Sequence, residues 1–145
     1  MQLLKVEVVT DEVLEAVCRL AREIGAHKPL PTRADLTDLV DSQASQLWVA
    51  RFPGENDPIA GMFTISVYRV PTGLRSIVED VAVDSRMRRL GIARAMMLKA
   101  IEVARAAGAD GVFLSSNSKR EAANQLYQAM GFERRETNAY IYRLK

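Results

Sequence analysis

Four arginines gather between an apolar strand and an amphipathic helix, in the segment DSRMRRLGIAR at residues 84–94. No acidic residue occurs from 85 to 101. A helix N-terminus has unpaired N–H groups and a partial positive charge, so it can hold an anion. Gly91 lets the backbone come close to a ligand, and Ala93 keeps the next turn small. The helix start and the arginines of this acid-free stretch therefore predict a phosphate or pyrophosphate site. The pattern of Arg88, Gly91 and Ala93 supports the prediction because it lies between a strand and an amphipathic helix.

Two adjacent carboxylates, Glu79 and Asp80, belong to the strand that leads into this segment. Alternation along residues 74–83 predicts one face with Ile77, Glu79, Val81 and Val83, and the other with Val78, Asp80 and Ala82. A carboxylate on an apolar face is costly unless it is used or paired. Glu79 is therefore a candidate for catalysis or substrate binding, with pairing to a neighbouring Arg75 as the structural alternative. Asp80 is the second candidate.

Hydrophobic periodicity predicts the elements that position these residues. Strands are expected at 3–9, 47–52, 59–70, 74–83, 112–115, 132–135 and 139–144. Helices are expected from Asp11 to the break at Gly25, in a short segment capped by Thr32, at 91–107 and at 121–130. The order β-α-α-β-β-β-α-β-α-β-β indicates an α/β (α+β) fold with helices on a mixed sheet. The unit 74–115 should be a right-handed crossover whose ligand site lies at the carboxyl end of its strands.

Length and composition limit the classes of protein that this chain can represent. A chain of 145 residues and 16.1 kDa has the size of one domain. No run approaches the ~18 apolar residues of a membrane helix, and the N-terminus lacks the pattern of a signal peptide. Cys18 and His27 are the only cysteine and the only histidine, which excludes an internal disulfide and a structural zinc site. We expect a cytoplasmic protein with no metal.

The net charge of +2 conceals an uneven distribution. Residues 1–60 contain six basic and ten acidic side chains, whereas residues 61–145 contain fourteen basic and eight acidic ones. A basic half favours a phosphate-bearing partner and an acidic half favours a cation, although two ordinary solvated surfaces would show the same numbers. The arginines are compact, with few aromatic residues interleaved for stacking, so we expect neither a nucleic acid nor a membrane as partner.

Three motifs occur in order between Ile77 and Phe132: a V-x-V strand followed by R-R-x-G-x-A, a G-A-x-x-V-x-L strand, and an A-x-x-L-Y-x-x-x-G-F helix end. This segment resembles the acetyl-CoA-binding core of the GNAT N-acetyltransferase superfamily. The resemblance implies a mostly antiparallel mixed sheet flanked by helices, one domain over residues 1–145, and acetyl-CoA as co-substrate. A homodimer is common in that family.

The resemblance also assigns cofactor contacts. Backbone groups of Val81, Ala82 and Val83 would pair with the pantetheine arm, and the Val81 amide would stabilise the oxyanion. The pyrophosphate would be held by the segment Arg88, Arg89, Leu90, Gly91, Ile92, Ala93 and Arg94. Many relatives have asparagine where this chain has Arg120, so the pantetheine contact is left open among Asn117, Arg120 and Asn124.

Catalysis by such an enzyme needs an acid and a base. Tyr127 occupies the position of the family tyrosine that protonates the leaving thiolate, although packing on its helix stripe is the alternative role. An ammonium acceptor must lose a proton before it attacks, and Glu79 is the candidate base, directly or through water. The expected reaction is direct transfer to a primary amine in a ternary complex. The acidic N-terminal half favours a small cationic amine; a protein or peptide amine, or a module that binds acyl-CoA without catalysis, are the alternatives.

Overall fold

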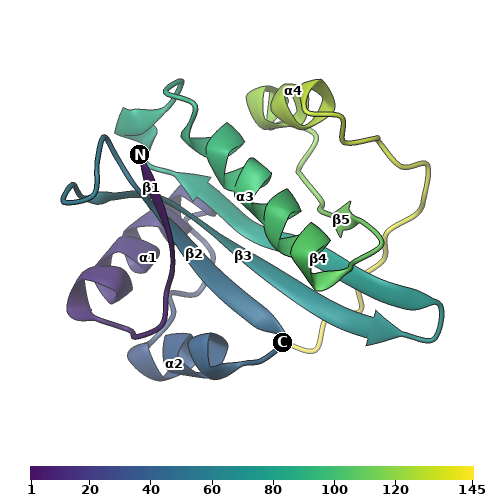
Figure 1. The fold of residues 1–145 in the computed structure, drawn as a ribbon, viewed down its shortest axis with the longest axis horizontal. Helices are drawn as coiled ribbons and strands as arrows, with labels where there is room; N and C mark the ends of the chain where they lie inside the picture. Colours follow the sequence, from purple (N-terminus) through teal and green to yellow (C-terminus); the bar gives the residue numbers. More distant parts are fainter. The chain divides into compact units, whose positions relative to one another are not determined.

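The computed structural model describes residues 1–145 and contains two compact units. Met1–Ser115 form the first and Ser116–Lys145 the second. The first unit contains the whole sheet and three α-helices, and the second contains one helix followed by an irregular segment (Figure 1). The expectation of a single domain stays a prediction. No helix reaches the length and apolar character that crossing a membrane requires.

The sheet of the first unit has five strands in chain order. They are β1 (Gln2–Lys5), β2 (Ser45–Arg51), β3 (Ile59–Val70), β4 (Gly73–Val83) and β5 (Val112–Phe113). The first four run antiparallel to their neighbours, and β5 is parallel to β4. The predicted mixed, mostly antiparallel sheet and the parallel crossover from β4 to β5 are therefore confirmed. Strand β5 is shorter than the segment 112–115 expected for it.

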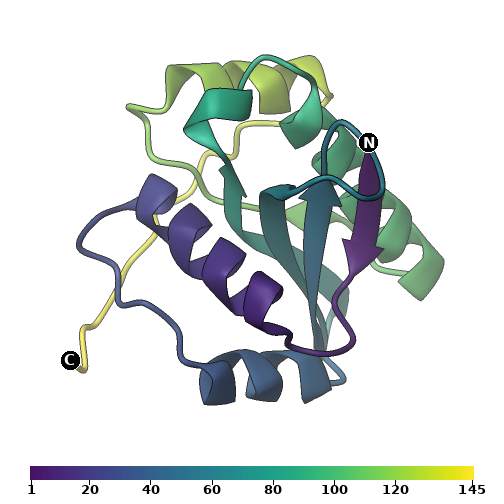
Figure 2. The same cartoon turned by 90° about the vertical axis from the view of Figure 1, so that its left-hand side faces the viewer.

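Helices cover both faces of this sheet. Helices α1 (Asp11–Ile24) and α2 (Arg33–Asp41) lie on one face and α3 (Ile92–Ala107) on the other (Figures 1 and 2). Thr10 caps α1 by accepting a hydrogen bond from the Val13 amide. Thr32 and Asp35 form the reciprocal capping box that their spacing predicts at the start of α2. These caps stop the two helices from extending into the loops beside them.

Each face of the sheet has its own apolar core. On the α1 side, Val13, Val17 and Leu20 pack with Met62 and Ala82. On the α3 side, the rings of Trp48 and Phe63 stack with their centroids 6.2 Å apart, and the Lys99 ammonium lies 5.5 Å from the Trp48 ring. A side chain at Gly61 would place its Cβ 3.0 Å from Met96 Sδ and 3.1 Å from Ile92 Cγ2. Glycine at this position therefore lets α3 pack directly on β3.

A bulge in β4 overturns the single alternation predicted for residues 74–83. Met62 pairs with Ala82 and Thr64 with Glu79, so two residues of β4 lie opposite Phe63 alone. Asp80 adopts a φ of 51°, which no regular strand contains. The extra residue reverses the side-chain order, because each shift of one residue exchanges the two faces. Glu79 therefore faces the α1 side, whereas Val83 faces α3.

The second unit departs from the prediction after its helix. Helix α4 (Glu121–Ala129) ends where expected, with Gly131 at a φ of 95° and the Phe132 amide bonded to the Tyr127 carbonyl. The strands predicted at 132–135 and 139–144 are wrong, because residues 132–145 contain no regular secondary structure. Tyr140 and Tyr142 alternate as in a strand but are 90% and 88% exposed. A segment with alternating side chains forms a strand only where a neighbouring strand pairs with its backbone.

Candidate active site

The 84–91 loop joins β4 to α3 and ends at an open helix N-terminus. It contains a 3₁₀ turn, Ser85–Met87, and reaches the left-handed region at Arg89 and Gly91, with φ values of 63° and 80°. No side chain caps α3 at Gly91. The first N–H groups of the helix, at Ile92, Ala93 and Arg94, thus have the orientation that binds an anion. A Cβ at Gly91 would meet nothing within 4 Å, so open space adjoins the helix end.

The side chains around this helix end divide into two groups. Arg88, Arg89, Leu90 and Arg94 are exposed, whereas Ile92 is 1% exposed and belongs to the core. Ile92 can therefore contribute only its backbone to a bound phosphate. The arginines add positive charge beside the unpaired N–H groups. These residues fit an anionic group such as a pyrophosphate.

The edge of β4 beside this helix end is open over half its length. Strand β5 pairs with β4 only at Ser76 and Ile77, so β4 has no hydrogen-bonded neighbour on that side beyond Ile77. The Asp84 amide donates to the Ala60 carbonyl on β3, at 2.8 Å. Because backbone groups alternate along a strand, those of Ala82 also face β3, and those of Val81 and Val83 point to the open side. An extended ligand can pair with them as an added strand.

Glu79, the predicted base, is an exposed residue opposite Thr64 on the α1 face of the sheet. Its carboxylate therefore does not pay the cost of burial on an apolar face, which was one reason to consider Glu79 a candidate base. Arg75 does not fill the predicted role of structural partner. Its guanidinium carbon lies 6.0 Å from the Phe113 ring centroid, and its Nη2 donates to Thr72. Asp80 is exposed as well, at the bulge.

The predicted residues of the second unit form one helix and the turn before it. Tyr127 is 6% exposed, and its ring meets the Phe132 ring edge-on at 5.8 Å. Burial raises the pKa of the Tyr127 phenol, and the positive charge of Arg120 opposes that rise. The Asn124 side chain donates to the carbonyls of Asn117 and Arg120, each at 2.9 Å, and thereby holds the start of α4. Because its pKa is raised, the Tyr127 phenol is protonated at neutral pH.

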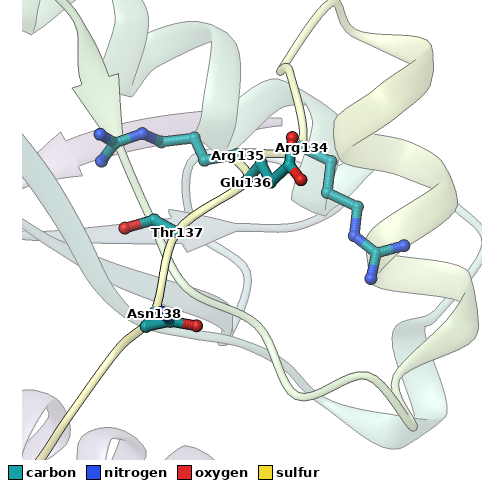
Figure 3. A pocket seen from close by; sticks show the side chains of 5 residues that line it. All are labelled: Arg134, Arg135, Glu136, Thr137 and Asn138. Atoms are coloured by element: carbon teal, nitrogen blue, oxygen red, sulfur yellow. The ribbon is translucent and has the colours of Figure 1, made fainter.

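Two further features of the second unit were not predicted. The Ser116 hydroxyl is buried and has no hydrogen-bond partner, so a polar ligand atom could satisfy it. A hollow beyond α4 is lined by the consecutive residues Arg134–Asn138 (Figure 3). It contains no residue predicted to act in catalysis or cofactor binding.

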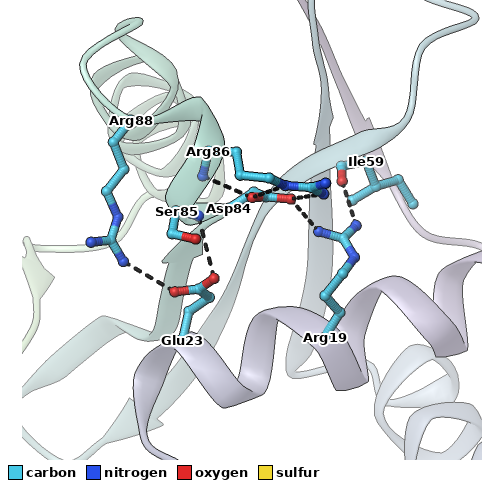
Figure 4. Close-up of polar contacts among 7 residues, drawn as sticks. All are labelled: Arg19, Glu23, Ile59, Asp84, Ser85, Arg86 and Arg88. Carbon is cyan, nitrogen blue, oxygen red and sulfur yellow. Dashed lines mark hydrogen bonds and ion pairs between the residues drawn. The ribbon is translucent and has the colours of Figure 1, made fainter.

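Sequence reasoning also missed a polar cluster that ties α1 to the 84–91 loop (Figure 4). Asp84 is buried and accepts hydrogen bonds from Arg19 Nη1 at 2.6 Å and from Arg86 Nη2 at 3.0 Å. Arg19 Nη2 also donates to the Ile59 carbonyl at 2.8 Å. Glu23, one turn further along α1, accepts from the Ser85 amide and from Arg88. Residues 65 positions apart meet in each of the pairs Arg19–Asp84 and Glu23–Arg88, and no local motif contains both members of a pair.

Arginine holds the pKa of Asp84 well below its ordinary value, at about 2. The main cause is the hydrogen bond from the Arg86 side chain, followed by that from the Arg86 amide, with smaller contributions from the charges of Arg86 and Arg19. A carboxyl with a depressed folded-state pKa stabilises the fold above its unfolded pKa near 4 and loses this contribution as the pH falls towards 2.

We therefore expect the free energy of unfolding to fall between pH 4 and pH 2 by about 2 kcal/mol more in the wild type than in Asp84→Asn. Urea unfolding at a series of pH values measures this difference. Equal pH dependence in the two proteins would contradict the assignment of the depressed pKa to Asp84.

A family model and two curated relatives match this chain. The sequence matches the model of the Acetyltransferase (GNAT) family over residues 11–132. N-acetyltransferase family 8 members 3 and 7 of Mus musculus are each 30% identical over 112 residues, which are 75% of this chain and 48% of the relative. The chain thus spans about half the length of the curated relatives it matches.

Solved structures share the fold at lower identity. A putative acetyltransferase from Agrobacterium tumefaciens has a TM-score of 0.84 and 20% identity, covering 99% of this chain and 100% of that one. An aminoglycoside acetyltransferase from a soil metagenomic sample, solved in complex with trehalose, has a TM-score of 0.80 and 18% identity, covering 99% and 96%. The family match and the shared fold together define the class of protein. This chain belongs to the GNAT acetyltransferase family, whose members use acetyl-CoA as co-substrate.

Proposed function

We propose that this protein is an acetyl-CoA-dependent N-acetyltransferase that acts by direct transfer in a ternary complex. The observation that carries the proposal is the open edge of β4 beyond Ile77, which runs into the uncapped N-terminus of α3. An extended arm that ends in a pyrophosphate matches both features, because the arm pairs with backbone and the anion meets free N–H groups. Both features lie in the first compact unit.

In this mechanism Val81 and Val83 bind the pantetheine arm, and the N–H groups at the start of α3 hold the pyrophosphate. Glu79 takes a proton from the acceptor ammonium, directly or through water, so that the free amine attacks the thioester carbonyl. The Val81 amide stabilises the oxyanion that forms. When the C–S bond breaks, Tyr127 donates its proton to the departing thiolate. The acetyl group goes straight to nitrogen, without a covalent enzyme intermediate.

The acceptor that we propose is a small cationic amine. Ten acidic and six basic side chains in residues 1–60 favour a cation on this side, although Arg88, from the basic half, already pairs with one of these carboxylates, Glu23. The aminoglycoside acetyltransferase of the same fold, solved also with sisomicin, binds such a molecule. A protein or peptide amine is the second candidate acceptor, and a module that binds acyl-CoA without catalysis is the alternative outside the enzyme class.

Calorimetric titration with acetyl-CoA, free CoA and propionyl-CoA tests the donor part of the proposal. We expect one-to-one binding of acetyl-CoA and CoA in the micromolar range. Thiol release from acetyl-CoA with a panel of small polyamines, amino sugars and peptides then identifies the acceptor. If none of acetyl-CoA, free CoA and propionyl-CoA binds, the proposal is overturned. Binding without thiol release for any amine would leave the non-catalytic module.

Glu79→Gln should lower kcat by about 100-fold at neutral pH and leave the Kd for acetyl-CoA unchanged, because only the base is lost. Asp80→Asn is the matched variant at the next position, where the bulge begins. Steady-state kinetics with the best acceptor, together with calorimetry, measures both effects. Turnover retained in Glu79→Gln and lost in Asp80→Asn would move the role of base to Asp80.

A further inference from the structure

Helix α1 reaches the 84–91 loop with two polar side chains that lie one turn apart, Arg19 and Glu23 (Figure 4). Neither residue occurs in the motifs that predict cofactor binding. The Arg19 guanidinium uses one nitrogen for Asp84 and another for the Ile59 carbonyl, at 2.6 Å and 2.8 Å. It therefore connects the end of β4 with the start of β3 and with α1.

Asp84 is fixed in position through both its backbone and its side chain. Its amide donates to Ala60 at 2.8 Å, and its carbonyl accepts from the Met87 amide at 2.8 Å. Its carboxylate, which is 8% exposed, accepts from Arg19 and from the side chain and amide of Arg86. A residue held from so many directions determines where the chain leaves the sheet. The turn that follows it leads directly to Gly91 and α3.

We propose that Asp84 and Arg19 are positioning residues for donor binding. They hold the 84–91 loop in the conformation that presents the N–H groups of the α3 N-terminus to the pyrophosphate of an acyl-CoA. Neither side chain needs to touch the donor, because both act through the loop backbone. The inference rests on the proposed function, since it names the residues that prepare the anion site for the donor. Glu23 supports the same loop through Ser85 and Arg88.

The negative charge of Asp84 allows an experiment to distinguish positioning of the loop from a direct electrostatic effect on the bound anion. A carboxylate beside an anion site repels the anion, so its removal would strengthen CoA binding if charge alone mattered. Loss of positioning has the opposite sign, because the loop then samples conformations in which its N–H groups do not converge. Asp84→Asn keeps the size of the side chain and removes the charge.

We expect the Kd for free CoA to rise at least tenfold in Asp84→Asn, measured by calorimetry on the whole chain. Arg19→Lys keeps the charge but cannot hold Asp84 and Ile59 with one planar fork, so the Kd should rise about threefold or more. This second variant also tests the proposal if Asp84→Asn does not fold. Asp35→Asn, in the capping box of α2, is the matched control and should bind CoA as the wild type does.

A donor without the nucleotide adds a readout that general damage to the fold would not produce. The ratio of kcat/KM for acetyl-CoA to kcat/KM for acetyl-pantetheine should fall at least tenfold in Asp84→Asn, because only acetyl-CoA uses the loop. Unchanged or tighter CoA binding in both variants, with a wild type that binds CoA, would overturn this inference and leave the proposed function intact. A wild type that does not bind CoA would overturn both.

Discussion

Tyr127→Phe should lose at least 99% of kcat while its Kd for acetyl-CoA changes less than twofold. The substitution removes only the hydroxyl, which in the proposed mechanism protonates the CoA thiolate as it leaves. General acid catalysis contributes about 100-fold to 10,000-fold to a rate, so the expected loss lies at the lower end of that range. Phenylalanine keeps the ring that packs edge-on against Phe132. Stopped assays of thiol release and calorimetry with acetyl-CoA measure the two quantities.

The pKa of Tyr127 shapes the pH dependence of this step. Burial raises the pKa of the phenol above its ordinary value of 10, so the acid form persists through the neutral range. Activity should therefore show no loss from Tyr127 ionisation in the neutral range. A donor whose thiol is a strong acid, such as an aryl thioester, needs no proton on departure and should lessen the defect of Tyr127→Phe. Full turnover of acetyl-CoA by Tyr127→Phe would remove Tyr127 from the mechanism.

Gly91→Ala should weaken acetyl-CoA binding about tenfold or more. Gly91 starts α3 at a φ of 80°, and a Cβ built there would project into open space. In the proposed complex the pyrophosphate fills that space, so the added methyl group would keep the anion from the N–H groups of the helix. Calorimetric titration of the variant with acetyl-CoA measures the loss.

Gly108 supplies an unusually close control for this experiment. It ends the same helix at a φ of 81°, and its Cβ would also meet nothing within 4 Å. Alanine at either end therefore meets the same left-handed strain, about 1 kcal/mol, without a steric clash inside the protein. Urea unfolding should show similar destabilisation of the two variants, and only Gly91→Ala should lose affinity. Equal affinity in both variants would contradict a pyrophosphate at the α3 N-terminus.

Local chemistry made much of the first unit predictable. The capping box of Thr32 and Asp35 marks the start of α2, and a glycine marks each end of α3. Both signals are local, because they depend on backbone conformation and on hydrogen bonds to nearby residues. The apolar stripe between the two glycines indicates the helix itself. The proposed anion site is local in the same sense, because one loop and one helix end supply every group in it. Such a site can be recognised in eleven consecutive residues.

Other predictions failed where the local structure depends on a partner that is distant in the chain. The alternation of residues 74–83 could not reveal the bulge at Asp80, because a bulge is a mismatch with β3 and not a property of β4 alone. The alternating aromatic residues at 140 and 142 predicted a strand, yet a strand exists only through hydrogen bonds to a neighbour. Glu79 consequently faces the side opposite to Val83, which the sequence pattern had placed beside it.

The sequence by itself determined the helix boundaries, the mixed sheet, the glycine turn before α3 and the family to which the chain belongs. The helix boundaries and the turn depend on residues near in the chain, and each motif that indicates the sheet or the family is a contiguous run of residues. Only the tertiary structure revealed that Arg19 and the buried carboxylate of Asp84, 65 positions apart, form an ion pair at the 84–91 loop. Side chains that meet through folding carry no common spacing, because their distance in space depends on how the helix packs on the sheet.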